Sequence, residues 1–337
     1  MPETSHIIII AEAGVNHNAS MEMARRMVRE AARAGADYVK FQTAVPELVI
    51  SSIAPKAEYQ KETTGEGESQ LDMCRAIHLP LTAYAELAEL CREEGIGFMS
   101  TPFDLVSIDT LVPLGMDYWK IPSGEITNLP YLRKIASKGG KVILSTGMST
   151  LNEVEAAVRV LEQGGISRQD ITLLHCTTQY PTPMEDVNLR AMDALKALGC
   201  GGVGYSDHTL GIEVPVAAAA RGAMVIEKHF TLDKNLPGPD HRASLEPAEL
   251  KAMVDAVRNI EKALGSGDKC VAPSERANIE IARKSIVAAR DIAAGETFSE
   301  ENITVKRPGG GINPMLWDDV IGKTAIRDFA YDSLIEL

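Results

Sequence analysis

Short apolar runs alternate along most of the chain with longer segments in which apolar residues recur every three or four positions. Met23, Met27, Val28 and Ala31 form one such segment, and this spacing is typical of one face of a helix. The apolar runs themselves have the length of buried strands. They occupy residues 7–11, 37–41, 95–100, 117–121, 141–145, 171–175, 202–206 and 223–227.

Eight strands that alternate with helices over about 260 residues predict an α/β protein of the (β/α)8 TIM-barrel type. A doubly wound sheet is the alternative, but no glycine-rich phosphate loop follows the first run, as that fold would favour. The clearest helix covers residues 247–265 and ends at Gly265.

Two segments interrupt the alternation. Residues 44–81 are polar and predict a long loop, which beside the active face of a barrel is more often functional than idle. Residues 266–283 are polar and rich in turn-forming residues, which is typical of a linker. We therefore expect a barrel domain over residues 1–265 and a small domain of short strands and turns over residues 284–337. A domain this small is expected to dock on a larger surface.

Composition and charge narrow the class of protein. The net charge of −13 leaves no basic surface for nucleic acid. The five cysteines are an odd number without a CxxC pair, which favours reduced thiols in the cytoplasm over a disulfide framework or a zinc knuckle. The N-terminal stretch, residues 1–14, reads as a strand and not as a signal peptide, and no apolar run has the length of a membrane span.

Two histidines follow the last two runs, His208 after residues 202–206 and His229 after residues 223–227. They are expected at the same end of neighbouring strands, where a barrel carries its chemistry. Neutral imidazole is a common metal ligand. Two ligands are too few for structural zinc and favour a catalytic divalent ion with open positions, Mn²⁺ first and Mg²⁺ or Co²⁺ next. The alternative is a pair of hydrogen-bonded histidines that line a pocket.

Lys40 and Lys120 lie near the ends of otherwise buried runs, where an ammonium group is costly unless an anion pairs with it. One interpretation is a cradle for phosphate and carboxylate groups; the other is salt bridges to Glu12, Glu125 or Glu227. Hydroxyl groups that would complete such a cradle follow the same runs, at Ser100, Thr101, Ser123, Ser145 and Thr146.

Further polar residues suit hydroxyl binding and acid–base catalysis. A lysine that forms a Schiff base remains a second interpretation of the barrel, because a strand lysine can be made nucleophilic. Of the three strand lysines, Lys228 is the weakest candidate for the anion-binding cradle, because it neighbours His229 and is expected to point outward. The acid–base candidates are Glu12, Gln42, Glu125, Tyr180, Asp207 and Asp240.

Nine motifs spread over nearly the whole chain resemble the sialic acid synthase family. That resemblance implies a TIM barrel followed by an antifreeze-like (SAF) domain, and an enzyme that condenses phosphoenolpyruvate with an N-acetylated amino sugar. The motifs are IIAEAGVNHN, VKFQT, STPFD, WKIPSGE, ILSTGM, LLHCTTQYPTP, GYSDHTLG, IEKHFTLDKNLPGPDH and TVKRPGGG.

The resemblance also implies roles for individual residues. His208 and His229 match the metal ligands, and Glu12, Gln42 and Glu125 match residues around the sugar and the metal-bound water, as do Tyr180 and Asp240. The phosphoenolpyruvate positions are matched by Lys40, Thr101, Lys120, Ser123, Ser145, Thr178 and Ser206. At Thr178 some members of the family carry asparagine, so an amide is lost there while a hydroxyl is kept.

Arg307 matches an arginine that reaches from the small domain of one subunit into the barrel of its partner and holds the N-acetyl group. The resemblance therefore implies a homodimer with swapped C-terminal domains. The turn Gly309–Gly311 that follows differs from the Gly-Asn-Gly of some relatives. From the residues alone, Arg307 would be a solvated side chain.

The expected reaction gives a nine-carbon 2-keto acid and phosphate. N-acetylmannosamine, which yields N-acetylneuraminate, is the first expectation for the sugar. The alternative is a 2,4-diacetamido-2,4,6-trideoxymannose, which yields N,N'-diacetyllegionaminate. A Schiff-base aldolase and a non-enzymatic sugar-binding protein are the more remote interpretations.

Overall fold

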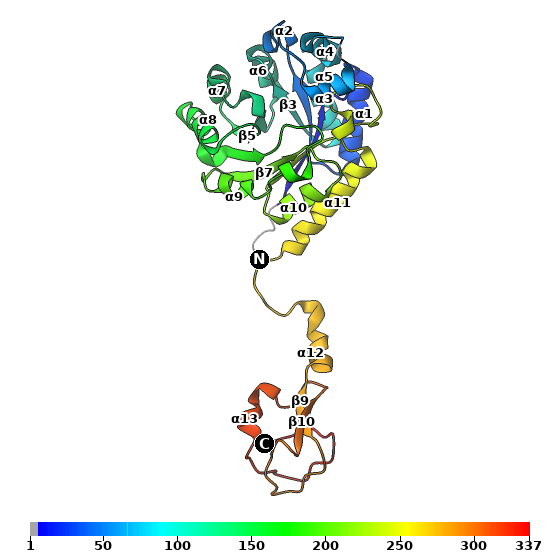
Figure 1. Ribbon diagram of the computed structural model, residues 1–337, viewed down its shortest axis with the longest axis vertical. Coiled ribbons are helices and arrows are strands. Elements are labelled where there is room, and N and C mark those ends of the chain that lie inside the picture. Colours follow the sequence, from blue (N-terminus) through cyan, green and yellow to red (C-terminus); the bar gives the residue numbers. More distant parts are fainter. Residues whose placement is uncertain (1–5, 66) are drawn as a thin grey trace. The chain divides into compact units, whose positions relative to one another are not determined.

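The computed structural model describes residues 6–65 and 67–337, which divide into two compact units between Ser266 and Gly267. The first unit holds a sheet of eight parallel strands, hydrogen-bonded in the order β3-β2-β1-β8-β7-β6-β5-β4, and β3 also lies against β4 (Figure 1). The predicted (β/α)8 barrel is therefore confirmed, and each apolar run forms one strand. The strands are β1 Ile8–Gly14, β2 Tyr38–Thr43, β3 Gly97–Pro102, β4 Tyr118–Ile121, β5 Lys141–Ser145, β6 Ile171–His175, β7 Gly202–Asp207 and β8 Val225–His229.

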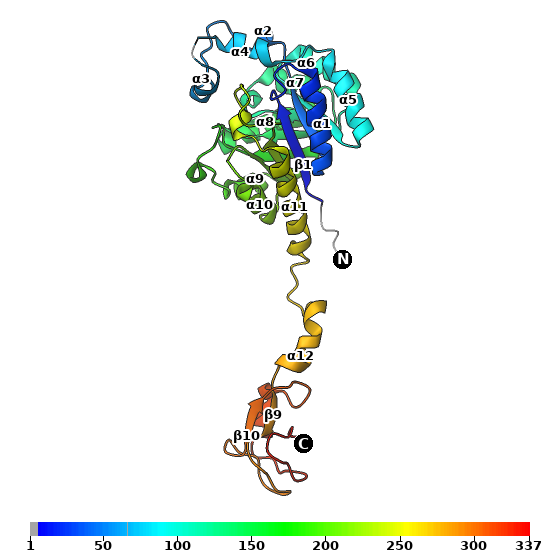
Figure 2. The same cartoon turned by 90° about the vertical axis from the view of Figure 1, so that its right-hand side faces the viewer.

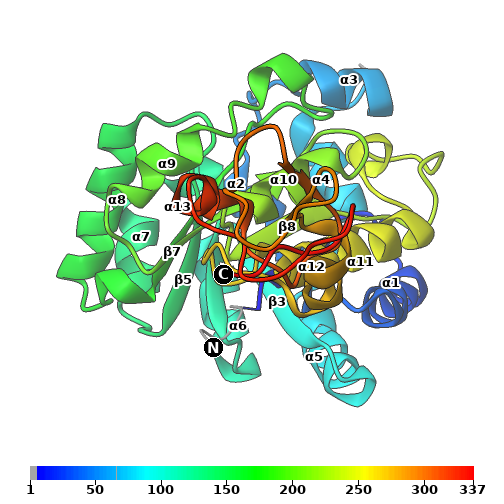
Figure 3. The same cartoon turned by 90° about the horizontal axis from the view of Figure 1, so that it is seen from below.

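Helices surround the strands, as the view along the barrel shows (Figure 3). Their apolar faces pack on the outside of the sheet and form the main core. The clearest predicted helix is confirmed: it ends before Gly265, whose positive φ of 59° favours glycine. The helices of this layer are α1 Met21–Ala34, α5 Ala83–Glu94, α6 Leu105–Leu111, α7 Leu129–Ala136, α8 Leu151–Gln163, α9 Ala191–Lys196, α10 Glu213–Ala220 and α11 Pro247–Leu264.

The interior of the barrel changes from apolar to polar along the strands. Side chains alternate between the two faces of a strand, so residues two apart share a face. One buried cluster fills the amino-terminal half of the interior with Ile10, Met99, Ile143, Leu174 and Val225. Two residues further along the chain from each of these stand Glu12, Thr101, Ser145, Cys176 and Glu227, all of which line a cavity. The alternation alone thus carries a polar layer to the carboxyl ends of the strands.

The segment expected to be a loop over residues 44–81 contains three short helices, so that expectation was incomplete. They are α2 Pro46–Val49, α3 Glu58–Thr64 and α4 Gln70–Ile77. They lie together beyond the end of the barrel toward which β1 runs (Figure 2). Residue 66 in this segment, like residues 1–5 of the N-terminal stretch, lies outside the described residues.

The second unit has a small core of its own around Ile286, Phe298 and Phe329. Its antiparallel strands β9 Ser285–Ala288 and β10 Ile303–Lys306 pair with each other, and α13 Trp317–Val320 follows. The stretch expected to be a linker carries a helix, α12 Arg276–Ala282.

Candidate active site

A cavity of about 440 Å³ lies at the carboxyl ends of the barrel strands, under the segment that carries α2, α3 and α4. Thirteen of the fifteen residues predicted for the site line it: Glu12, Lys40, Gln42, Thr101, Lys120, Ser123, Ser145, Thr178, Tyr180, Ser206, His208, His229 and Asp240. The structure brings these side chains together, while their individual roles stay predictions.

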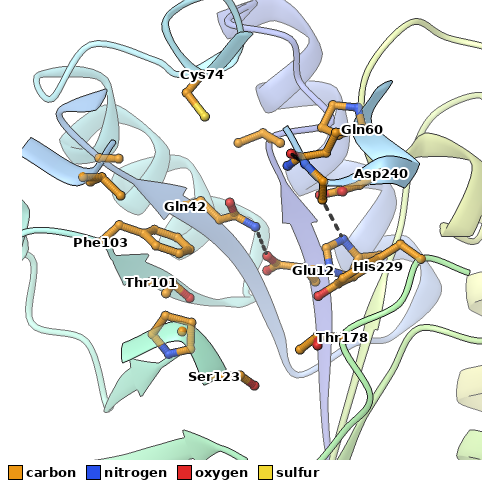
Figure 4. A pocket seen from close by; sticks show the side chains of 18 of the residues that line it. Glu12, Gln42, Gln60, Cys74, Thr101, Phe103, Ser123, Thr178, His229 and Asp240 are labelled. Atoms are coloured by element: carbon orange, nitrogen blue, oxygen red, sulfur yellow. Dashed lines mark hydrogen bonds and ion pairs between the residues drawn. The ribbon is translucent and has the colours of Figure 1, made fainter. Parts of the chain in front are cut away.

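The first side of the cavity is built by β1, β2 and β3. Glu12 of β1 is aligned with Lys40 of β2, and its carboxylate lies 2.7 Å from the Lys40 ammonium. Lys40 also donates to the hydroxyl of Thr101 at 2.9 Å. The Gln42 amide donates to Glu12 at 3.0 Å, and the two side chains lie next to each other in the cavity wall (Figure 4).

The second side is built by β4, β5, β7 and β8. Lys120 donates to the hydroxyl of Ser145 at 2.8 Å and lies 3.5 Å from the carboxylate of Glu227. Ser206 donates to the same carboxylate at 3.0 Å. Sequence reasoning treated Glu227 only as a salt-bridge partner, although it stands two residues before His229 on one strand. Strand alternation was the signal that places both side chains on the inner face.

The cavity therefore holds two buried ammonium groups, of Lys40 and Lys120, and three buried carboxyl groups, of Glu12, Glu227 and Asp240. Burial lowers the pKa of Lys120 despite the nearby Glu227 carboxylate. Burial acts on the Lys40 ammonium in the same direction, but the Glu12 and Glu227 carboxylates outweigh it and raise the pKa of Lys40. Burial also raises the pKa of Asp240 to about 7, with a further contribution from the charge of Glu12. Lys40 is thus held as a cation.

The two histidines are 5.4 Å apart between ring centroids. Nδ1 of His208 lies 2.6 Å from the carbonyl oxygen of Thr177, an arrangement in which Nδ1–H donates and the Nε2 lone pair stays available. Nδ1 of His229 has no hydrogen-bond partner among the described residues, and its nearest carboxylate oxygen, on Asp240, is 3.8 Å away (Figure 4). Burial lowers the pKa of His208 to about 4. Burial, and then the nearby His208, hold the pKa of His229 well below its usual value. Both rings are therefore neutral near pH 7, as metal ligands must be.

These donors fit a divalent ion that takes few protein ligands. In the described part of the chain, no group of three or more histidine, cysteine or acidic side chains is arranged to hold a metal. A site made of His208 and His229 leaves most of the coordination positions to water or substrate, which is typical of a catalytic and not of a structural ion.

Two predicted residues lie elsewhere. Glu125 is not among the side chains that line the cavity; it accepts a hydrogen bond from Asn128, the residue that caps α7, at 2.6 Å. Arg307 follows β10 in the second unit, where it is exposed. The buried Lys228 pairs with Asp207, and neither lines the cavity, so Lys228 points away as expected and Asp207 is not brought to the site.

Helix α3 contributes two residues that sequence reasoning missed, Tyr59 and Gln60. The Tyr59 ring lies 5.1 Å from that of Tyr180, which in turn lies 4.1 Å from the ring of His208. The period of two that marks the inward-facing residues of the strands does not extend to α3. These contacts are therefore visible only from the position of α3 over the barrel.

The model of the NeuB family matches residues 27–269, and that of the SAF domain matches residues 283–336. This chain belongs to the NeuB family. It is a synthase of the sialic acid type that carries a C-terminal SAF domain, as the sequence motifs predicted.

Relatives of known name agree with this assignment. The N,N'-diacetyllegionaminic acid synthase of Campylobacter jejuni is 54% identical over 328 residues, which cover 97% of this chain and 98% of that protein. The enzyme of the same name from Legionella pneumophila is 46% identical, with coverage of 93% and 89%. A solved structure of the N-acetylneuraminic acid synthetase of Leptospira borgpetersenii is 35% identical with a TM-score of 0.71, over 82% of this chain and 91% of that one. No helix in the described residues of this NeuB-family chain is long and apolar enough to cross a bilayer.

Proposed function

We propose that this NeuB-family enzyme condenses phosphoenolpyruvate with 2,4-diacetamido-2,4,6-trideoxymannose to give N,N'-diacetyllegionaminate and phosphate. The observation that carries the choice of sugar is the 54% identity, over nearly the full length of both chains, to a protein named for that product. N-acetylmannosamine, the first expectation from the sequence, is the less favoured substrate.

The arrangement of charge supports phosphoenolpyruvate as the second substrate. The net charge of −13 repels an anion overall, so a trianionic substrate needs local cations. Lys40 and Lys120 supply them inside the cavity, and the hydroxyls of Thr101 and Ser145 already lie within 2.9 Å of these ammonium groups. Hydrogen bonds from charged donors to phosphate or carboxylate oxygens are the stronger kind.

His208 and His229 would hold a divalent ion, Mn²⁺ in the first place, which would act as a Lewis acid on the aldehyde oxygen of the open-chain sugar. The two rings lie on the side of the cavity next to Tyr180 and Asp240, so we assign the sugar to that side. Lys40 and Lys120, which lie 3.8 Å and 3.5 Å from the carboxylate of Glu227, would hold phosphoenolpyruvate between them.

In the reaction, the methylene carbon of phosphoenolpyruvate forms the new bond to the aldehyde carbon of the sugar. Water adds to the carbon that becomes C2 of the product, and the bond from that carbon to the phosphate oxygen breaks. The carboxylate of Glu12 lines the cavity whereas that of Glu125 does not, so Glu12 is the proposed acceptor of the water proton. Gln42, bound to Glu12 at 3.0 Å, orients that carboxylate.

The test is an assay of the purified full-length protein with Mn²⁺, phosphoenolpyruvate and each of the two sugars. We expect phosphate and a nine-carbon keto acid in equal amounts, with kcat/KM for the diacetamido sugar roughly a hundredfold above that for N-acetylmannosamine. A higher kcat/KM with N-acetylmannosamine would overturn the choice of sugar. Keto acid formed without phosphate release would overturn the reaction.

A further inference from the structure

The cavity has two chemically different ends. Its floor, at the strand ends, is made of charged and hydroxyl side chains such as Lys40, Lys120 and Glu227. Opposite the floor, α2 and α4 line the cavity with a group that we call the apolar roof. It consists of Val49, Ile50, Met73, Cys74 and Ile77.

The apolar roof is a built surface. Helices α2 and α4 pack against each other, and Met73 is 2% exposed. The sulfur of Met73 lies 3.6 Å from the hydroxyl of Thr64 at the end of α3. The buried Lys56 ammonium donates to that hydroxyl and to the carbonyl oxygen of Gly65, both at 3.0 Å. These contacts tie α3 to α4.

Cys74 belongs to the apolar end although it can ionise in principle. Burial, and then the charge of Asp240, raise the pKa of its thiol to about 11, so it stays neutral near pH 7. A neutral, half-buried thiol behaves as a small apolar group. The side chain points from α4 into the cavity, from the side opposite Ser123 (Figure 4).

Three polar side chains line the cavity beside the apolar roof: Gln60, Gln70 at the start of α4, and His78. Those of Gln60 and His78 are engaged within their own segment. The side-chain amide oxygen Oε1 of Gln60 accepts from the Ala57 backbone N–H at 2.9 Å. Nδ1 of His78 lies 2.8 Å from the Cys74 carbonyl oxygen. A sugar hydroxyl that entered between Met73 and Cys74 would therefore meet sulfur and aliphatic carbon, and would lose hydrogen bonds to water without full replacement.

We propose that the apolar roof is the specificity determinant for the sugar: it receives the C6 methyl group and the methyl of the 4-acetamido group. This assignment rests on the proposed function and adds to it the residues that select the diacetamido sugar over N-acetylmannosamine. N-acetylmannosamine carries hydroxyl groups at both C4 and C6, which the apolar roof would leave without partners. An apolar pocket discriminates against a single added hydroxyl by roughly a hundredfold.

The experiment compares kcat/KM for the two sugars in wild-type enzyme, Met73→Gln and Cys74→Ser, with Leu71→Gln as the control. Met73→Gln keeps the length of the side chain and adds a polar amide. Cys74→Ser replaces the thiol by a hydroxyl of nearly the same shape, at a half-buried position. Leu71 stands on the same helix but does not line the cavity. We expect the preference for the diacetamido sugar to fall roughly tenfold or more in the two roof variants. The KM for phosphoenolpyruvate and the behaviour of Leu71→Gln should stay as in wild type.

Thermal unfolding of each variant separates a changed cavity from a damaged fold, and Cys74→Ser keeps the test valid if Met73→Gln unfolds. Normal turnover with an unchanged sugar preference in the folded roof variants would overturn this assignment alone. No turnover of either sugar by wild-type enzyme would overturn the proposed function, and this assignment with it.

Discussion

The ammonium nitrogen of Lys40 lies 2.7 Å from a carboxylate oxygen of Glu12, and neither side chain exposes more than 3% of its surface. The two residues are partners in the register of β1 and β2, so the parallel sheet itself sets this distance. Removing one member of a buried ion pair typically costs about 3–5 kcal/mol, because the other charge stays buried without its partner. A substitution of either residue should therefore change both the stability of the barrel and the proposed substrate site.

Lys40→Met should lower the free energy of unfolding by about 3–5 kcal/mol and abolish turnover, since Glu12 would lose its cation and phosphoenolpyruvate its anchor. The double variant Lys40→Met/Glu12→Gln should regain most of the stability, because no charge is then left unpaired at these two positions. It should remain inactive. Urea unfolding and phosphate release measure the two effects, and equal stability of the single and double variants would contradict the pairing.

Metal removal should abolish activity. Excess EDTA should stop turnover and Mn²⁺ should restore it, because the proposed Lewis acid would be held by only two protein ligands, His208 and His229. His208→Ala and His229→Ala should each behave as the chelated enzyme and should not quench the electron paramagnetic resonance signal of added Mn²⁺. The exposed histidine variant His6→Ala is the control and should act as wild type. Full activity in EDTA would favour the Schiff-base aldolase, provided that borohydride also reduces and thereby traps a covalent adduct of pyruvate with the enzyme.

Stability should fall with acid through His17, which is fully buried and whose Nε2 has no partner among the described residues. Burial, with a smaller contribution from His78, lowers the pKa of His17 to about 3, against about 6.5 in the unfolded chain. The contribution of His17 to the free energy of unfolding is thus fully present above pH 6.5 and is lost as the pH falls from 6.5 toward 3. The slope in that window is about 1.4 kcal/mol per pH unit.

In the wild type, the Ala19 N–H donates a hydrogen bond to Nδ1 of His17 at 3.2 Å. His17→Asn removes the titrating group and keeps an acceptor near this N–H. Between pH 7.5 and pH 5, the loss of unfolding free energy should be about 2 kcal/mol smaller in this variant than in wild type. Urea unfolding at both values measures the difference. The same loss in variant and wild type would show that His17 does not titrate in the folded protein as expected.

The role of Arg307 in the partner's site stays a prediction from the family resemblance. Arg307→Ala should lower kcat/KM for the sugar by about ten- to a hundredfold, the equivalent of one charge-assisted hydrogen bond. Lys40→Ala should be nearly inactive. Co-expression of the two variants would form mixed dimers with one barrel that has both residues, so activity should rise well above the sum of the separate variants. Mixed dimers without recovered activity would place Arg307 in its own chain's site or in none.

The strand positions followed from sequence because apolar runs and their period of two are local properties. The same period explains why Glu12, Lys40, Lys120 and Ser145 were correctly expected at one end of the barrel: parallel strands bring their carboxyl ends to one edge. Glu227 was within reach of the same argument, since it shares the inner face of β8 with His229.

What only the tertiary structure decided lies off the strands. Glu125 comes directly after Gly124, a residue that lines the cavity, yet its own carboxylate turns to Asn128 at the start of α7. Tyr59 meets Tyr180 because α3 folds back over the barrel, a contact between residues far apart in the chain. Alternation and helical spacing state which face of an element is buried, but the packing of one element on another depends on long-range shape and side-chain volume. For that reason the sequence determined the polar floor of the cavity, and the fold determined its apolar roof.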